Sequence, residues 1–358
     1  MTAPYAALGQ LGEAMQGRLP PDVDWLALIK LANDALMTPA VAGALLPAAA
    51  LPDDVRAFLA DVRARNAARN ARLADQLTEA VGVLNRAGVE PVLLKGAALW
   101  AGRSPDEPFD RLLADLDLLV APHEAARARA ALTLHGYSVM AEKDGADVHA
   151  VAELARPQDA AAIDLHQRAP GPPGLAQPRD FSARCRRVNW AGVSARVPDP
   201  AFQVFLTILH DLFHDGDFWR GAFDLRHLHD VAVLAGRPEG VDWEALHDLA
   251  GTRLARHAVA AQLLAARRLF GARIPAERVE TPRARLQHAR RLAQLRWPQL
   301  RTPLAFGGLL LEAPHLPEHA LANRAGRERV LDGAQGLGEA DRLSRLRQIL
   351  APPATGKV

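Results

Sequence analysis

The sequence has little of what secreted and membrane proteins depend on. Cys185 is its single cysteine, which excludes an intrachain disulfide and a metal site built from several cysteines. No uncharged apolar run reaches the ~18 residues of a membrane span, and the N-terminus lacks the basic and apolar segments of a signal peptide. The 43 basic and 41 acidic side chains leave a net charge of +2, so no global field attracts nucleic acid or an anionic membrane. We expect a cytoplasmic protein without a membrane span, and nucleic acid is disfavoured as a partner but not excluded.

Length and patterning predict two lobes that follow a helical segment. The chain has 358 residues, of which 49% are hydrophobic and 23% charged, enough for a sizeable core. Apolar residues recur at helical spacing from Pro52 to about Ala87, and Gly88 ends this pattern. Prolines and glycines cluster at 170–178, which indicates a loop or a lobe boundary. We therefore expect an N-terminal helical segment at 1–84, a core with short strands at 85–180, a helical lobe at 181–350 and a disordered tail at 351–358.

The stretch from Asp115 to Val120 has the apolar run of a short buried strand, interrupted by two carboxylates. Side chains alternate between the faces of a strand, so Asp115 and Asp117 point the same way, roughly 6–7 Å apart, while Leu116 and Leu118 point into a core. Neighbouring carboxylates resist burial unless a cation lies between them. Oxygen ligands in this arrangement suit Mg²⁺, which also binds substrate phosphates. Taken alone, the pattern is more often a pair of solvated aspartates at a strand end.

The stretch 89–96 predicts a second short buried strand, which ends in Lys95-Gly96 and is followed by a helical stretch. A glycine at such a turn lets the backbone approach a ligand, and the first N–H groups of the helix can bind an anion. A lysine at this place suits a phosphate. The alternative is a surface lysine beside an ordinary turn glycine.

Other polar residues recur around these two strands. Arg111 comes just before the strand that holds Asp115. A helix is predicted at about 124–135, and Gly136-Tyr137 closes it. In the next short strand, 163–166, Asp164 and His166 share one face.

A later helix is predicted to begin at Asp199, with Pro200 at its first position, and to carry His210 and His214. The His-Asp-x-x-His pattern resembles the helix of zinc proteases, but its aspartate is shorter than the usual glutamate and no third ligand is obvious. Pairing of the histidines with nearby carboxylates is the preferred interpretation. The basic stretches at 63–72 and 283–301 are interpreted as solvated faces rather than nucleic-acid patches.

In order along the chain, these features resemble one bacterial family within the polymerase-β-type nucleotidyltransferase superfamily, known as the uncharacterised nucleotidyltransferases. The matching features are Leu94-Lys95-Gly96, Arg111, Asp115-x-Asp117 with Leu119-Val120, Gly136-Tyr137, Asp164-x-His166, His210-x₃-His214 and Asp230. The resemblance covers about 85–250. The wider superfamily usually has Gly-Ser at the turn where this sequence has Lys95-Gly96. The resemblance implies an α+β fold, in which a small mixed β-sheet core with flanking helices lies beside a mainly α-helical lobe.

The resemblance also implies an activity, which is Mg²⁺- or Mn²⁺-dependent transfer of a nucleoside monophosphate from a nucleoside triphosphate such as ATP. The acceptor is expected to be a hydroxyl or similar group on a small molecule, peptide or protein. Three aspartates are expected to hold the metal and support catalysis: Asp115, Asp117 and Asp164. Four residues are expected to contact the nucleotide: Lys95, Gly96, Arg111 and His166. Two metal ions would stabilise the attacking and leaving oxygens at the α-phosphorus.

Two alternatives stay open from the sequence. One is a nucleotide-binding or scaffold protein that keeps the fold but has lost turnover, which the three intact aspartates argue against. The other is a toxin-like enzyme that transfers nucleotides to tRNA, which the near-neutral charge argues against.

Overall fold

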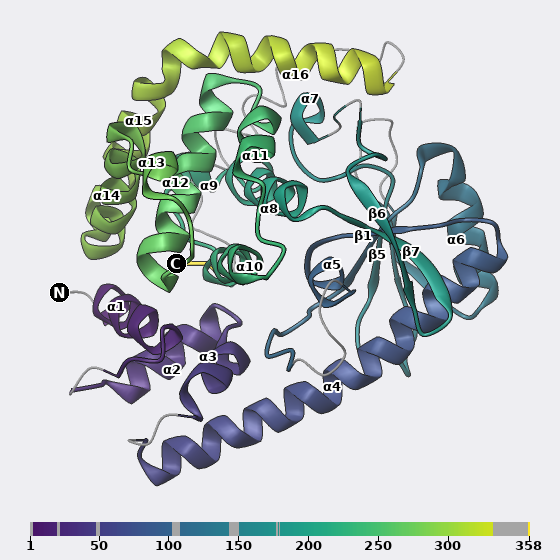
Figure 1. Ribbon diagram of the computed structural model, residues 1–358, viewed down its shortest axis with the longest axis horizontal. Coiled ribbons are helices and arrows are strands. Elements are labelled where there is room, and N and C mark those ends of the chain that lie inside the picture. The colour runs from purple at the N-terminus through teal and green to yellow at the C-terminus, as the bar shows by residue number, and fades with distance from the viewer. Residues whose placement is uncertain are drawn as a thin grey trace.

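The computed structural model describes residues 3–19, 22–47, 51–101, 108–142, 150–176, 178, 180–331 and 357–358. It confirms the expected α+β architecture. In Figure 1 a sheet lies to the right, a helical lobe lies to the left and top, and one long helix runs along the lower edge from the N-terminal helices to the sheet. No helix in these described stretches is both long and apolar enough to cross a membrane.

The sheet has seven strands in the order β3-β4-β5-β2-β1-β7-β6. It is mixed, because β1 pairs in parallel with β7 and β2 pairs in parallel with β5, while the other neighbours are antiparallel. The strands are β1 Val92–Leu93, β2 Leu116–Leu119, β3 Ser138–Glu142, β4 Ala150–Ala155, β5 Ile163–His166, β6 Cys185–Trp190 and β7 Val193–Pro198. The last two lie beyond position 180, where the sequence suggested that the helical lobe begins, so the sheet extends past that expected boundary.

The N-terminal helices do not form a unit of their own. They are α1 Ala3–Met15, α2 Trp25–Asp34, α3 Thr38–Leu45 and α4 Asp53–Arg86. Leu8, Leu28 and Val41 belong to the same buried cluster as Phe202 and Leu264 of the helical lobe. The far end of α4 belongs instead to the core of the sheet. The 34-residue helix α4 therefore connects two cores.

The first helix of the helical lobe begins at the cap that the sequence predicts. The carboxylate of Asp199 accepts a hydrogen bond from the backbone N–H of Phe202, and Pro200 occupies the first helical position. Gly271, with a φ of 64°, ends the lobe's longest helix. The helices of the lobe are α8 Pro200–Leu209, α9 Asp217–Arg220, α10 Leu225–Gly236, α11 Trp243–Leu249, α12 Arg253–Phe270, α13 Ala276–Val279, α14 Pro282–Arg296, α15 Arg301–Glu312 and α16 Leu316–Leu331. Short helices α5 Lys95–Ala101 and α6 Ala125–Leu134 accompany the sheet, while α7 Pro173–Ala176 packs against α16 of the helical lobe.

Two basic stretches that the sequence placed on solvated faces turn partly inward. On α14, Arg290 and Arg291 are buried and donate to the backbone carbonyls of Phe218 and Ala222. On α4, Arg69 donates to the backbone carbonyl of Ala160. Guanidinium groups offer five donors each and can satisfy carbonyls that a helix or loop leaves open. The spacing of charged residues in these helices therefore does not show which arginines are exposed and which are buried.

The last two residues also differ from the expected disordered tail. Lys357 makes ion pairs with Asp215 and Asp217, and Val358 exchanges two backbone hydrogen bonds with Phe223. The remainder of 351–358 lies outside the described residues.

Candidate active site

The face of the sheet that is turned toward the helical lobe carries the predicted carboxylates. Asp117 of β2 and Asp164 of β5 are register partners in the parallel pair, so they lie side by side. Alternate residues of the same strands, such as Leu118 and Leu165, are buried in the core of the sheet. Leu119, on the face of Asp117, belongs to the core cluster of the helical lobe instead. The two strands thus place an acidic pair between the two cores.

Lys95 brings a cation to this acidic pair. Its φ of 45° lies in the left-handed region, which is costly for a residue with a side chain. This conformation occurs where the chain turns from β1 into α5, and the Lys95 Nζ lies 2.7 Å from the Asp117 Oδ1. The His166 Nε2 donates to the same oxygen at 2.9 Å.

Mutual electrostatics shift the pKa values in this cluster in opposite directions. Burial alone would raise the pKa of Asp117, but Lys95 and His166 outweigh it and hold the pKa well below its usual range. Burial, together with the charges of Asp117 and Asp115, raises the pKa of Asp164. Burial would lower the pKa of Lys95, but the three aspartates outweigh it and raise that pKa. The Lys95 ammonium thus interacts electrostatically with all three aspartates, and Asp117 holds it most closely.

The donor set fits a hard divalent cation. Asp117, Asp164 and His166 each offer a ligand atom, and these atoms lie within 4.8 Å of one another. Asp115 precedes β2 and is not part of this compact group, although its charge acts on both Lys95 and Asp164. Carboxylate oxygens are the ligands that Mg²⁺ prefers, and a cation there would relieve the repulsion that raises the pKa of Asp164.

Gly96 has a packing role in the structure rather than an open approach to a ligand. A Cβ at this position would lie 2.2 Å from the Leu113 side chain and 2.3 Å from the Arg111 Nη1. Residue 96 must therefore be glycine for the segment before β2 to pack against the start of α5.

Arg111 lies next to the site, but its guanidinium already has a partner. Its Nε and Nη2 each donate to a different carboxylate oxygen of Asp230 at 2.8 Å, and both side chains are buried. This two-point contact joins the segment before β2 to α10 of the helical lobe. The structure thus directs Arg111 toward Asp230, whereas the sequence suggested a contact with the triphosphate.

The pairing of Arg111 with Asp230 was not found from the sequence. Both residues were noted there, but 119 positions separate them, and neither charge pattern nor helical spacing connects residues so far apart. A buried arginine can be satisfied by a carboxylate or by backbone carbonyls, as Arg290 and Arg291 are, so no sequence signal identified Asp230 as the partner.

A mostly apolar pocket opens beside Lys95, between the sheet and the helical lobe. Its cavity volume is about 20 Å³, room for about one water molecule. The sheet side contributes the start of α5 and the end of β7, and the lobe contributes α8 and α10. Its lining includes Lys95, Leu99, Pro198, Gln203, Thr207 and Leu234. A water molecule there would contact both lobes and lie next to the Lys95 ammonium.

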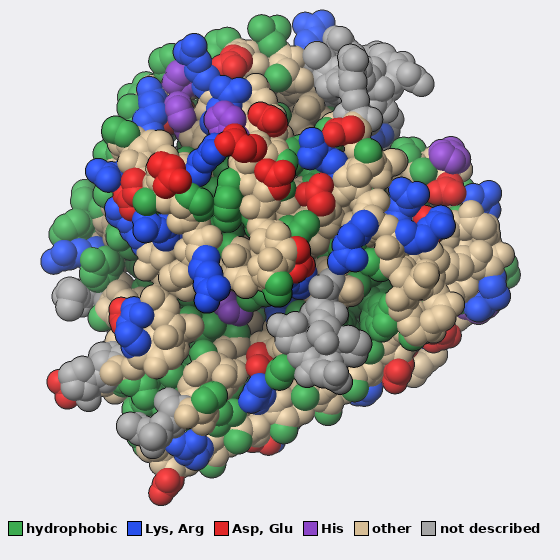
Figure 2. Space-filling view, in the orientation of Figure 1, with side chains coloured by type: hydrophobic (Ala, Val, Ile, Leu, Met, Phe, Trp, Pro, Cys, Tyr) green, Lys and Arg blue, Asp and Glu red, His purple; other side chains and the backbone are tan. Residues whose placement is uncertain are grey.

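The surface seen in Figure 2 carries basic and acidic side chains interspersed over both lobes. This agrees with the balanced composition and presents no broad basic area among the described residues on that face.

Comparisons with known proteins give the following matches. A family model described as "Uncharacterised nucleotidyltransferase" matches residues 21–271. No curated protein matches the chain. Among solved structures, that of the antibiotic-resistance factor ANT(2'')-Ia is similar over 56% of this chain and 94% of that chain, with 13% identity and a TM-score of 0.30.

Proposed function

Because the chain belongs to the family of uncharacterised nucleotidyltransferases, we propose that it moves a nucleoside monophosphate from a nucleoside triphosphate to an acceptor in a Mg²⁺- or Mn²⁺-dependent reaction. The acceptor is a hydroxyl or similar group on a small molecule, peptide or protein. The observation that carries this proposal is the register of β2 and β5, which sets Asp117 beside Asp164 with the Lys95 ammonium 2.7 Å from Asp117.

Three carboxylates would hold the metal: Asp115, Asp117 and Asp164. When bound, Mg²⁺ or Mn²⁺ would neutralise charge on the triphosphate and stabilise the attacking and leaving oxygens. Lys95 is bonded to Asp117 in the structure, and its ammonium would turn to a phosphate oxygen when that carboxylate becomes a metal ligand. His166 holds the Asp117 carboxylate in place through its 2.9 Å hydrogen bond.

Asp164 is the residue we assign to the acceptor. It lies beside Asp117 in the register of β2 and β5, so its carboxylate can accept the proton of a hydroxyl that attacks a nucleotide held there. The acceptor oxygen forms a bond to the α-phosphorus, the bond between that phosphorus and the bridging oxygen breaks, and pyrophosphate leaves. The acceptor's proton passes to Asp164.

Arg111 and Gly96 contribute by positioning. Arg111 fixes α10 to the segment before β2 through Asp230, and Gly96 lets that segment lie against α5.

A transfer assay tests the proposal. The protein is incubated with each α-³²P-labelled nucleoside triphosphate, Mg²⁺ or Mn²⁺, and a cell extract divided into small-molecule, protein and RNA fractions. We expect label in a small-molecule or protein product and none with Asp117→Asn. The matched control is His123→Ala, because His123 is exposed and lies outside the site.

The same assay separates the two alternatives. Label in the RNA fraction alone would favour a tRNA nucleotidyltransferase. Tight Mg²⁺-dependent nucleotide binding without label in any fraction would favour a nucleotide-binding scaffold, and either result would contradict the proposed acceptor class or the proposed turnover.

A further inference from the structure

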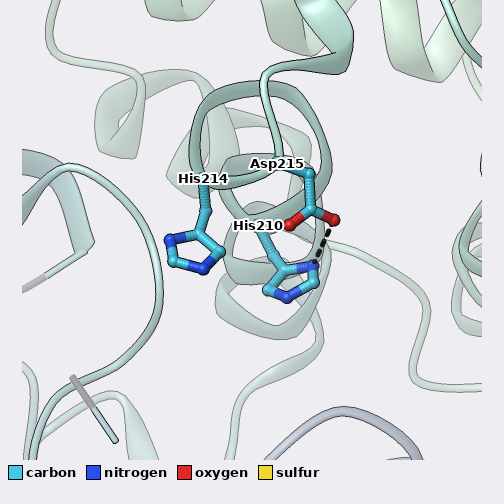
Figure 3. A group of neighbouring side chains, drawn as sticks. All are labelled: His210, His214 and Asp215. Carbon is cyan, nitrogen blue, oxygen red and sulfur yellow. Dashed lines mark ion pairs between the residues drawn. The ribbon is translucent and has the colours of Figure 1, made fainter. Parts of the chain in front are cut away.

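We propose that His210, His214 and Asp215 form a binding site for a divalent transition-metal ion, in addition to the carboxylate cluster on the sheet. The two histidines lie on one π-helical turn, His210–His214, which directly continues α8. Figure 3 shows both imidazoles extending from this turn in the same direction, with the Asp215 carboxylate beside the His210 ring.

The distances are close to those of a metal site. The three residues each offer a ligand atom, and these atoms lie within 4.8 Å of one another. In a tetrahedral zinc site with bonds of ~2.0–2.1 Å, neighbouring ligand atoms are about 3.3 Å apart. The His210 Nδ1 and the Asp215 Oδ2 are already 3.5 Å apart. His214 is exposed, so a small side-chain rotation closes the remaining gap.

The backbone of this turn is unusual for a helix. Among the described residues, His210–His214 is the one segment with π-helical hydrogen bonding. Single π turns within α-helices occur frequently at functional sites. In this turn the two imidazole centroids lie 5.4 Å apart with an interplanar angle of 31°. A nitrogen of each ring can therefore bind the same metal ion.

His210 makes only long ion pairs, at 3.5 Å, with Asp211 and Asp215, whereas a neighbouring histidine is held closely. The His227 Nδ1 lies 2.6 Å from the Asp211 Oδ1, so that pair is a well-formed hydrogen bond. The His210 Nδ1 is buried and finds no hydrogen-bond partner in the part of the chain that the structure describes, because its carboxylate neighbours lie at 3.5 Å. A buried ring nitrogen without a hydrogen bond is costly, and a metal ion would satisfy it.

The C-terminus already brings a cation to this place. The Lys357 Nζ lies 2.6 Å from the Asp215 Oδ2 and 2.5 Å from the Asp217 Oδ2. Burial would lower the pKa of Lys357, but Asp211, Asp217 and Asp215 outweigh it and raise that pKa. The carboxylates thus attract positive charge strongly, and a metal ion that binds Asp215 competes with the Lys357 ammonium for it.

The donor set identifies the class of metal. Two imidazoles with one carboxylate suit first-row ions such as Zn²⁺, Co²⁺ or Ni²⁺, whereas Mg²⁺ prefers oxygen ligands. Excess Mg²⁺ should therefore leave this site free, which makes the two kinds of site separable in one experiment.

The test is a titration of the full chain with Co²⁺ and with Zn²⁺ in the presence of millimolar Mg²⁺. Calorimetry gives the affinity, and the visible absorption of Co²⁺ reports imidazole ligation. We expect one site per chain that His214→Ala weakens at least ~10-fold. Because His214 is exposed, this variant keeps the fold, which circular dichroism checks. His247→Ala is the matched control, since His247 is also exposed and lies on α11.

Lys357→Gln tests the competition. Removing the ammonium leaves Asp215 without its strongest rival cation, so we expect tighter Co²⁺ binding. Equal Co²⁺ affinity and equal spectra for wild type, His214→Ala and His247→Ala would overturn the proposed site. Unchanged affinity in Lys357→Gln would overturn the role given to the C-terminus.

Discussion

Asp117 holds the densest set of contacts in the candidate active site. Its Oδ1 accepts from both Lys95 and His166, and the side chain is 2% exposed. Asp115, one position before β2, acts on the cluster through its charge, which raises the pKa of both Lys95 and Asp164. Replacing Asp117 therefore removes two direct contacts, with Lys95 and His166, whereas replacing Asp115 removes a charge that acts on the cluster.

We predict that Asp117→Asn and Asp115→Asn both abolish Mg²⁺-dependent nucleotide binding but differ in stability. Asp117→Asn leaves the Lys95 ammonium without its closest carboxylate, so we expect a loss of ~1–3 kcal/mol in the free energy of unfolding. Asp115→Asn removes a charge that repels Asp164 but attracts Lys95 and Arg111, so the two effects offset and we expect a smaller change in stability. Calorimetric titration with Mg·NTP and urea denaturation measure the two effects. Unchanged nucleotide affinity in both variants would contradict the metal assignment.

His288 makes the free energy of unfolding depend on pH, and this effect does not involve the active site. Burial and the nearby Arg291 lower the pKa of His288 to about 4. The unfolded chain binds this proton near pH 6.5, so at pH 5 the unfolded state holds a proton that the folded state does not. The associated stability is complete above pH 6.5 and is lost as the pH falls toward 4.

We expect this one group to cost about 2 kcal/mol of stability between pH 7 and pH 5. His288→Gln should remove that part of the pH dependence, whatever it costs at pH 7. Urea denaturation of both proteins at pH 7, 6 and 5 measures it. Parallel stability curves for wild type and variant would show that His288 does not remain neutral in the fold.

At the scale of single elements, α4 does more than cover the sheet. Asn70 Nδ2 donates to the backbone carbonyls of Phe109 and Arg111 at 3.0 and 3.1 Å, and Gln76 Nε2 donates to the carbonyl of Ala161 at 2.7 Å. These carbonyls lie on the segments that enter β2 and β5. The polar side chains of α4 therefore hold the two strands that carry Asp117 and Asp164.

We predict that Asn70→Ala lowers the free energy of unfolding by ~1–3 kcal/mol, because it leaves buried carbonyls without a donor. It should also reduce transfer activity, since the approach to β2 loses its anchor. Arg65→Ala is the control on the same helix: its side chain is exposed and pairs with Asp61, four residues away, so its loss should cost under ~0.5 kcal/mol. Equal stability of the two variants would contradict the anchoring role.

The short strands β1, β2 and β5 and the helix cap Asp199 were the part of the fold that the sequence could predict. Alternation in the stretch around Asp117 and the capping residue Asp199 are local signals, and the structure has both as expected. The polar face of α4 was not predicted to hold backbone carbonyls. A side chain that donates to a distant carbonyl has the same sequence pattern as one that faces water, because the carbonyl itself carries no sequence signal.

At the scale of the whole molecule, the Arg111–Asp230 contact connects the sheet to the helical lobe. Both side chains are buried, and both carboxylate oxygens of Asp230 are used. Removing one partner of a buried pair leaves an uncompensated charge, which typically costs ~3–5 kcal/mol, while replacing both with apolar residues costs much less.

A double-mutant cycle tests this connection. We expect Asp230→Leu and Arg111→Met each to destabilise strongly, and the double variant to be more stable than the sum of the two losses predicts. Thermal unfolding of the four proteins measures it. Additive losses would mean that the two residues act independently. The sequence also did not predict that α1, α2 and α3 share one core with the helical lobe. This core depends on contacts between residues far apart in the chain.

The central claim is that the carboxylates on β2 and β5 carry out nucleotidyl transfer, and Asp164→Ala tests it most directly. Once a labelled product has been found, wild type and variant are compared by equilibrium binding of Mg·NTP and by single-turnover transfer. Asp115 and Asp117 remain to hold the nucleotide's metal, so we predict nearly unchanged binding and a transfer rate at least ~10²-fold lower, because the proton acceptor for the attacking hydroxyl is gone. Equal transfer rates in the two proteins would contradict the account.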